Sequence, residues 1–120
     1  MDKSLENLEV YKKALEVSGM SYQLFKKIPF KLQSTGYQFL NASDSIGANI
    51  AEGYGRGTFK DRKNFMMIAR GSLYETFYWL SLLEERNLID AHSINDYKTQ
   101  LTHLARLIYG YTKYLKSKIP

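Results

Sequence analysis

The feature that most constrains this chain is a run of apolar residues at alternating spacings of three and four near its C-terminus. Such spacing puts side chains on one face of an α-helix, because a helical turn holds 3.6 residues. The run lasts three heptads, as in the seam of a helical bundle. Its members are Ile94, Tyr97, Leu101, Leu104, Ile108, Tyr111 and Leu115. We therefore expect a bundle, since one amphipathic helix needs others to cover it.

The rest of the sequence also favours helices. Proline occurs only at Pro29 and Pro120, and no alternating run of β-branched residues is present. Short turn signals separate the helical segments, so we expect one domain, residues 1–120, folded as an all-α, antiparallel up-down four-helix bundle. The predicted helices cover residues 7–27, 32–54, 60–86 and 91–117.

Particular residues are expected to begin and end these helices. Asn7 is the expected N-cap of the first helix, and Asp90 or Ser93 is the expected N-cap of the fourth. The glycines within residues 53–57 are expected to end the second helix, because glycine adopts positive φ without steric cost.

The third predicted helix is apolar on every side. Residues 65–69 are five apolar residues in succession, and residues 77–80, which include Trp79, repeat this pattern three turns later. Successive residues step about 100° around a helix, so such a run reaches all its sides. Three neighbours in a monomeric bundle rarely cover a helix all round. We therefore expect contacts between subunits.

A polar stripe runs along the second predicted helix. A freely solvated stripe would more often carry Lys or Glu, so we interpret this one as half buried, with its polar groups satisfied across helices or subunits. At its end, Glu52 precedes Arg56 by four residues, the order that favours a surface ion pair. The members of the stripe are Gln38, Asn41, Ser45, Asn49, Glu52 and Arg56.

Composition narrows the function classes. The chain has no cysteine, which excludes a disulfide scaffold and thiolate chemistry. Residues 1–6 carry no apolar signal core, and no apolar run approaches the 18 residues of a membrane span. We expect a cytoplasmic protein with no membrane association. The 17 Lys and Arg against 12 Asp and Glu give a net charge of +5, which is compatible with a polyanionic partner.

The segment from Gly55 to Lys63 is the candidate ligand site. Cations give sequence-independent affinity for phosphate, and its aromatic residue, Phe59, could stack on an unpaired base. The alternative is a solvated loop whose aromatic side chains pack as a helix staple. The basic residues 113–118 are interpreted as a complement to the helix dipole rather than a binding tail. The candidate phosphate contacts are Arg56, Lys60, Arg62 and Lys63.

Catalytic chemistry finds little support. A di-iron bundle needs Glu-x-x-His pairs, and neither His92 nor His103 has a glutamate three residues before it. Arg86 and His92 have a spacing similar to that of HEPN-type RNases, in which histidine could act as a base and arginine could stabilise phosphate charge. Their segment also forms an interhelical turn, where Asn and Asp have ordinary capping roles. An RNase is therefore a remote alternative, and no cofactor or metal is expected.

The motif Ser45-Ile46-x-x-Asn49-Ile50-Ala51-Glu52-Gly53-Tyr54-Gly55-Arg56 resembles the signature of the bacterial 23S rRNA intervening-sequence protein family. The segment Leu8–Ala14 is similar to the family's N-terminal segment, with Tyr11 where Trp is usual. Residues 65–75 resemble its third helix. Asn41 departs from the pattern, because a basic residue is common there, and this weakens nucleic-acid binding through that face.

This resemblance implies a four-helix bundle assembled into a homopentamer, with no established enzymatic activity and an unresolved role. Related proteins include the accessory variability proteins of retroelements, whose basic barrels associate with nucleic acid and reverse transcriptase. We therefore expect a non-enzymatic oligomer that binds RNA or DNA. The alternative is a scaffold that docks a protein partner such as a polymerase. Residues assigned to packing or subunit contact are Ser45, Asn49, Glu52, Gly53, Arg70 and Trp79.

Overall fold

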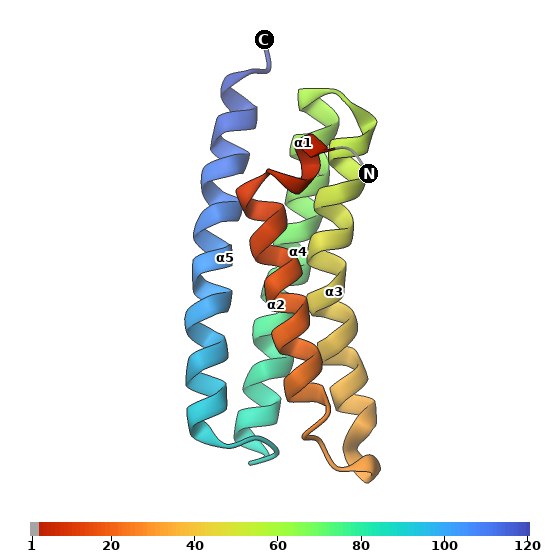
Figure 1. The fold of residues 1–120 in the computed structure, drawn as a ribbon, viewed down its shortest axis with the longest axis vertical. Helices are drawn as coiled ribbons and strands as arrows, with labels where there is room; N and C mark the ends of the chain where they lie inside the picture. Colours follow the sequence, from red (N-terminus) through yellow and green to blue (C-terminus); the bar gives the residue numbers. More distant parts are fainter. Residues whose placement is uncertain (1–2) are drawn as a thin grey trace.

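Four long helices form the body of the computed structural model, which describes residues 3–120 (Figure 1). A short helix and a 3-10 turn accompany them, and the described residues contain no strand, so the all-α prediction is confirmed. Residues 1 and 2, part of the predicted domain and of the segment expected to lack a signal, lie outside the described residues. The elements are α1 (Lys3–Glu6), α2 (Glu9–Phe25), η1 (Phe30–Leu32), α3 (Gln33–Arg56), α4 (Phe59–Glu85) and α5 (Ala91–Ser117).

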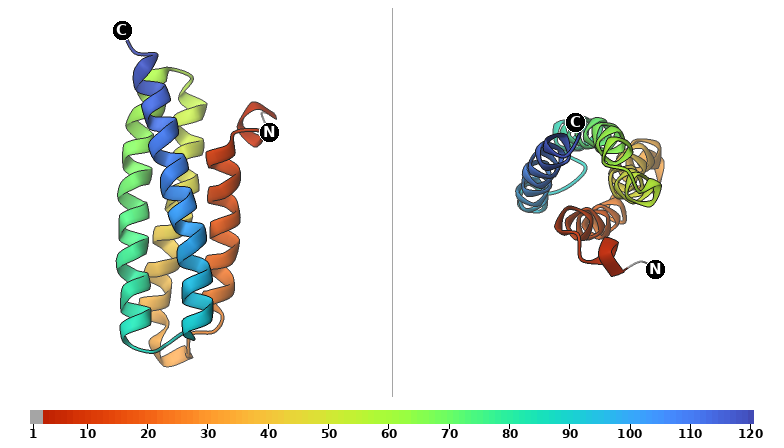
Figure 2. Two further views of the ribbon diagram at one scale, coloured as in Figure 1. Left: turned by 90° about the vertical axis from the view of Figure 1, so that its left-hand side faces the viewer. Right: turned by 90° about the horizontal axis from the view of Figure 1, so that it is seen from above.

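The long helices run up and down in chain order, and each contacts two others. The end view in Figure 2 shows α2, α3, α4 and α5 around one core, with α5 closing against α2. The α3–α4 pair has the most extensive contact. Because the helices alternate in direction, the α3–α4 turn, the C-terminal end of α5 and α1 share one end of the bundle.

The predicted seam of α5 lies in the core. Six of its seven residues are at most 1% exposed, and Tyr111 is half buried. The ring of Tyr97 packs 5.3 Å from that of Phe39, and its hydroxyl lies 2.6 Å from Oγ of Ser21. Ser21 in turn donates to the carbonyl oxygen of Val17 at 2.8 Å. Burial raises the pKa of Tyr97 above its usual value, so the phenol stays protonated and satisfied in the core.

Several predicted helix ends were wrong by a few residues. Asn7 is not a cap: α2 begins at Glu9, and Leu8 takes the N-cap position without a side-chain hydrogen bond. α3 continues to Arg56, and only Gly57 has positive φ, at 86°. The prediction that the preceding glycines end the helix was therefore wrong. They have ordinary helical φ, so the chain turns later.

The cap of the last helix was predicted correctly. α5 covers residues 91–117, as expected. Oδ2 of Asp90 accepts a hydrogen bond from the backbone N–H of Ser93 at 2.9 Å, and Oδ1 accepts one from its hydroxyl. These bonds hold the pKa of Asp90 below its usual range, because they stabilise the carboxylate.

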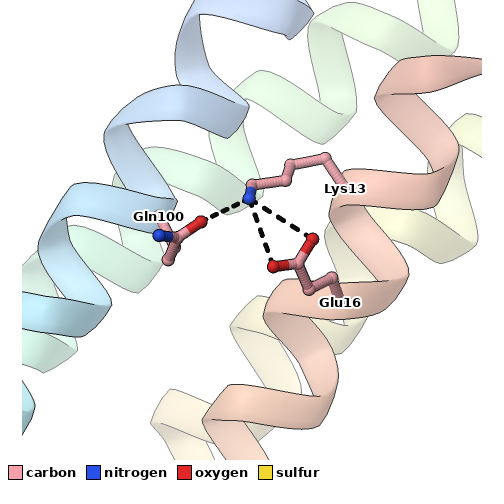
Figure 3. A network of polar contacts seen from close by, with 3 residues as sticks. All are labelled: Lys13, Glu16 and Gln100. Atoms are coloured by element: carbon pink, nitrogen blue, oxygen red, sulfur yellow. Dashed lines mark hydrogen bonds and ion pairs between the residues drawn. The ribbon is translucent and has the colours of Figure 1, made fainter.

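A polar contact joins α2 and α5 (Figure 3). Nζ of Lys13 donates to Oε1 of Gln100 and lies 3.3 Å from both carboxylate oxygens of Glu16. The Lys13 side chain is only 11% exposed. The ammonium group is therefore held between the two helices and stabilises their alignment.

One side of α4 is not covered by the described part of the chain. Met66 and Ala69 are at most 1% exposed, whereas Met67 is 41% and Ile68 is 51% exposed. The apolar run therefore reaches both the core and the surface, as its length predicted. Subunit contact over this surface stays a prediction.

Candidate nucleic-acid interface

The turn between α3 and α4 positions the predicted cations. Gly57 ends α3, and Thr58 caps α4 by accepting a hydrogen bond from the backbone N–H of Asp61 at 3.0 Å. The Thr58 hydroxyl also donates to the Asp61 carboxylate at 2.9 Å. Only two residues separate the helices, so the segment interpreted as a glycine-rich loop is mostly helical.

The two predicted arginines pack on aromatic rings. The Arg62 guanidinium lies 4.1 Å from the Tyr54 ring centroid and 6.0 Å from that of Phe59. Arg56 lies 5.1 Å from the Phe65 ring and pairs with Glu52 at 3.1 Å, which confirms the predicted ion pair. Both arginines thus have structural contacts, which leaves them less free to bind phosphate.

Arg62 also meets α5. Burial raises the pKa of Tyr111, and the nearby Arg62 guanidinium opposes that rise. The Arg62 Nε atom is buried without a hydrogen-bond partner among the described residues. Arg62 is therefore mainly a packing residue between three helices, rather than an open phosphate contact.

The two predicted lysines are different. Lys60 is exposed in the first turn of α4, and Lys63 is half buried one turn later. Neither makes an ion pair within the described chain. Their ammonium groups remain available to an anion.

A groove between α4 and α5 was missed by sequence reasoning. It encloses about 300 Å³ and opens on the same half of the bundle. Arg70 and Tyr74 line it from α4, while Tyr109, Lys113 and Lys116 line it from α5. The groove-lining residues of α4 and of α5 are spaced by three and four in the sequence, so each set could be placed on one helix face. Which faces meet depends on the register between the two helices, which the spacing does not give. Lys113 and Lys116 therefore line this groove, in addition to complementing the helix dipole.

Charge is separated along the bundle. When each long helix is divided at its midpoint, residues 4–17, 45–72 and 104–120 form the half with the α3–α4 turn, and they hold 11 Lys and Arg against 5 Asp and Glu. The other half, residues 18–44 and 73–103, holds 5 against 6. The net positive charge of these residues therefore lies on the half of the molecule that holds the α3–α4 turn.

The polar stripe on α3 is only partly buried. Gln38 and Asn41 are exposed on the single chain, so they are not buried within the bundle, and their burial between subunits stays a prediction. Ser45 and Asn49 are half buried: Nδ2 of Asn49 donates to the Ser45 carbonyl oxygen at 2.8 Å and to its Oγ at 3.0 Å. The Ser45 hydroxyl lies 3.0 Å from that of Ser72 on α4. The stripe is therefore satisfied across helices only where α3 meets α4.

The other assigned packing residues occupy separate places. Gly53 is buried against α4. Arg70 and Trp79 are nine residues apart on α4, so they lie on opposite sides of it. Arg70 lines the groove, whereas Trp79 is half buried, with its indole Nε1 lacking a hydrogen-bond partner among the described residues. The structure therefore does not gather these residues into one site.

The remote catalytic pair lies at the opposite end. His92 is exposed in the first turn of α5, and Arg86 donates to the Thr35 hydroxyl at 3.0 Å. Among the described residues, no group of three or more His, Cys, Asp or Glu side chains could hold a metal ion. No helix in that same part of the chain is long and apolar enough to cross a membrane.

Comparison with known proteins identifies the family. The family model for the 23S rRNA-intervening sequence protein matches residues 6–110. A crystal structure of a protein of unknown function, from the S23 ribosomal protein family of Bacteroides thetaiotaomicron VPI-5482, is 28% identical with a TM-score of 0.80. The alignment covers 87% of this chain and 95% of that one. A search of curated proteins found no match. The chain therefore belongs to the 23S rRNA-intervening sequence protein family.

Proposed function

We propose that this protein is a non-enzymatic, oligomeric, cytoplasmic helical-bundle protein that binds RNA or DNA through its basic half. The observation that carries the proposal is the separation of charge, with 11 cations against 5 carboxylates on that half. A surface with one sign of charge attracts polyanions over several ångströms and raises their encounter rate. Nucleic acid is the polyanion such a protein would meet in the cytoplasm.

The candidate contacts differ from those predicted from the sequence. Lys60 and Lys63 are the phosphate contacts at the α3–α4 turn, with Arg56 and Arg62 supporting them through packing. Because a lysine ammonium binds phosphate as a point charge, these contacts would favour no base sequence.

Binding of a labelled RNA fragment measured at several salt concentrations tests the proposal. The logarithm of the affinity should fall linearly with the logarithm of the salt concentration. The reason is that lysine and arginine side chains release counterions from the phosphates when they bind them. Replacing Lys60 and Lys63 with glutamine should lower that slope by about 1 to 2. Replacing Lys26 and Lys31, on the other half, should leave the slope unchanged. Absence of binding at low salt would overturn the proposal.

We also propose that the protein self-associates through the outer side of α4. Ile68 is 51% exposed there, which is unfavourable for a large apolar side chain in water. The family resemblance makes five subunits the expected number. Sedimentation equilibrium measures that number directly, and Ile68→Glu should reduce it. A monomer at all concentrations would refute self-association.

The same apolar surface favours a second candidate, a scaffold that docks a protein partner such as a polymerase. Nuclease treatment separates the two candidates, because it removes a nucleic-acid ligand but not a protein partner that binds directly. A partner that stays bound after nuclease treatment, and is lost with Ile68→Glu but not with the Lys60 and Lys63 changes, would favour the scaffold.

A further inference from the structure

The groove between α4 and α5 has an apolar floor and a polar rim. Leu73 and Ile108 in its lining are at most 2% exposed, so they close its base. The rim carries three cations, Arg70, Lys113 and Lys116, and none of the described residues that line the groove is a carboxylate. The groove is therefore complementary to an occupant with negative charge and a surface that apolar groups can cover.

The rim residues are arranged in matching steps on the two helices. Along α4 the sequence Met67, Arg70, Tyr74 advances by three and then four residues. Along α5, followed from its C-terminal end, Lys116, Lys113 and Tyr109 are also separated by three and then four residues. The helices are antiparallel and rise equally per residue, so Tyr74 lies level with Tyr109, and Arg70 lies level with Lys113. Further along, the ion pair between Lys98 and Glu84, at 2.9 Å, is consistent with this register.

The two levels have different chemistry. Tyr74 is 61% exposed and Tyr109 is 70% exposed, so most of each ring is open to a ligand. The next level, four residues or about 6 Å away, is cationic. The Arg70 guanidinium lies 5.6 Å from the Tyr74 ring centroid, which links the aromatic level to the cationic one. An aromatic level beside a cationic level is complementary to a base beside its phosphate.

We infer that this groove binds one unpaired nucleotide of a single strand, with its base on Tyr74 and Tyr109 and its phosphate at Arg70, Lys113 and Lys116. The inference rests on the proposed nucleic-acid binding and narrows it. Aromatic stacking is available only to a base that is not already paired and stacked, so the groove selects single strands over duplex. Since every base has a ring face, the selection does not depend on sequence.

The experiment compares one single-stranded oligonucleotide with a duplex of the same length, on the intact protein. The variant carries Tyr74→Ala and Tyr109→Ala. It should bind the single strand about 5-fold to 100-fold more weakly, the usual effect of losing a stacked base. Its affinity for duplex and its salt slope should stay at the wild-type values, because no charge is removed. By contrast, Lys113→Gln should lower the slope.

Tyr22→Ala provides the matched control. Tyr22 is also an exposed tyrosine beside a cation, with Lys26 Nζ 5.2 Å from its ring centroid, but it lies on the half without excess positive charge. This control should bind the single strand as the wild type does. Thermal unfolding of each variant checks that the bundle still folds.

The possible failures are distinguishable. If the wild type binds neither nucleic acid at low salt, both the proposed function and this inference fail. If the wild type binds but the double tyrosine variant holds the single strand equally well, the groove inference fails alone. If the double variant sediments as a smaller species than the wild type, the groove is an interface between copies of the chain, and the inference is overturned.

Discussion

Gly53 of α3 faces Phe65 of α4 at a distance that leaves no room for a side chain. A Cβ placed on Gly53 would lie 2.6 Å from the Phe65 Cβ and 3.3 Å from the Arg62 Cα. The backbones of the two helices therefore approach closely just below their connecting turn. This contact also holds Arg62, which packs over the Tyr54 ring. The glycine of the family motif thus positions the basic end of the bundle, although it does not end the helix.

Gly53→Ala should destabilise the protein. Overpacking costs about 1 to 3 kcal/mol, against about 1 kcal/mol gained from the higher helix propensity of alanine. Chemical denaturation measures the difference. Gly55→Ala is the control, because no atom of the described residues lies within 4 Å of a Cβ placed there, and it should stabilise the protein by up to about 1 kcal/mol. Equal stability of the two variants would contradict the close contact.

Asn49→Ala should lower stability, because two hydrogen bonds to Ser45 are lost. We expect a loss of about 1 to 2 kcal/mol, reduced by up to about 0.7 kcal/mol of helix propensity. Asn41→Ala changes the same residue type on the same helix at an exposed position, and should leave stability equal or slightly higher. An unchanged melting temperature for Asn49→Ala would show that the half-buried part of the stripe contributes nothing.

Tyr97→Phe should cost about 1 kcal/mol at pH 7, since Ser21 keeps its bond to the Val17 carbonyl oxygen. The pKa of Tyr97 is higher in the folded protein than the ordinary value of about 10. The free energy that Tyr97 contributes to stability is therefore fully present below pH 10. It declines as the pH rises above 10, because the phenol ionises more readily in the unfolded chain than in the folded protein. The difference in free energy of unfolding between wild type and variant should narrow above pH 10. A constant difference up to pH 11 would contradict the prediction.

Gln100→Leu should destabilise the protein by about 1 to 3 kcal/mol, because it leaves the Lys13 ammonium in its enclosed position with fewer acceptors. Adding Lys13→Met should recover part of this loss, since the amine is then removed as well. A double-mutant cycle measures the coupling between the two residues. Additive effects would mean that the contact in Figure 3 does not stabilise the bundle.

Purified protein should leave RNA intact. Arg86 donates a hydrogen bond to the Thr35 hydroxyl, and His92 is exposed at the end of the bundle far from the α3–α4 turn. Incubation with labelled RNA in the absence and presence of magnesium checks this. Cleavage that disappears with His92→Ala would establish the RNase alternative, and cleavage that persists would indicate contamination.

The sequence by itself determined the local properties of this protein. The spacing from Ile94 to Leu115 determined the core face of α5, and Asp90 determined where that helix begins. The motif ending at Arg56 identified the family. These features depend on residues within a few turns of each other, where helix periodicity and capping relate sequence to structure directly.

Only the tertiary structure decided which distant residues meet. Helix periodicity does not specify how one helix slides or rotates against another, so the sequence assigned Gly53 to a helix end and to packing or subunit contact, without Phe65 as its partner. For the same reason, Lys113 was assigned to the helix dipole, although it lines one groove together with Arg70. The side chains packed between the helices set this register, and that packing places both tyrosines and three cations along one groove.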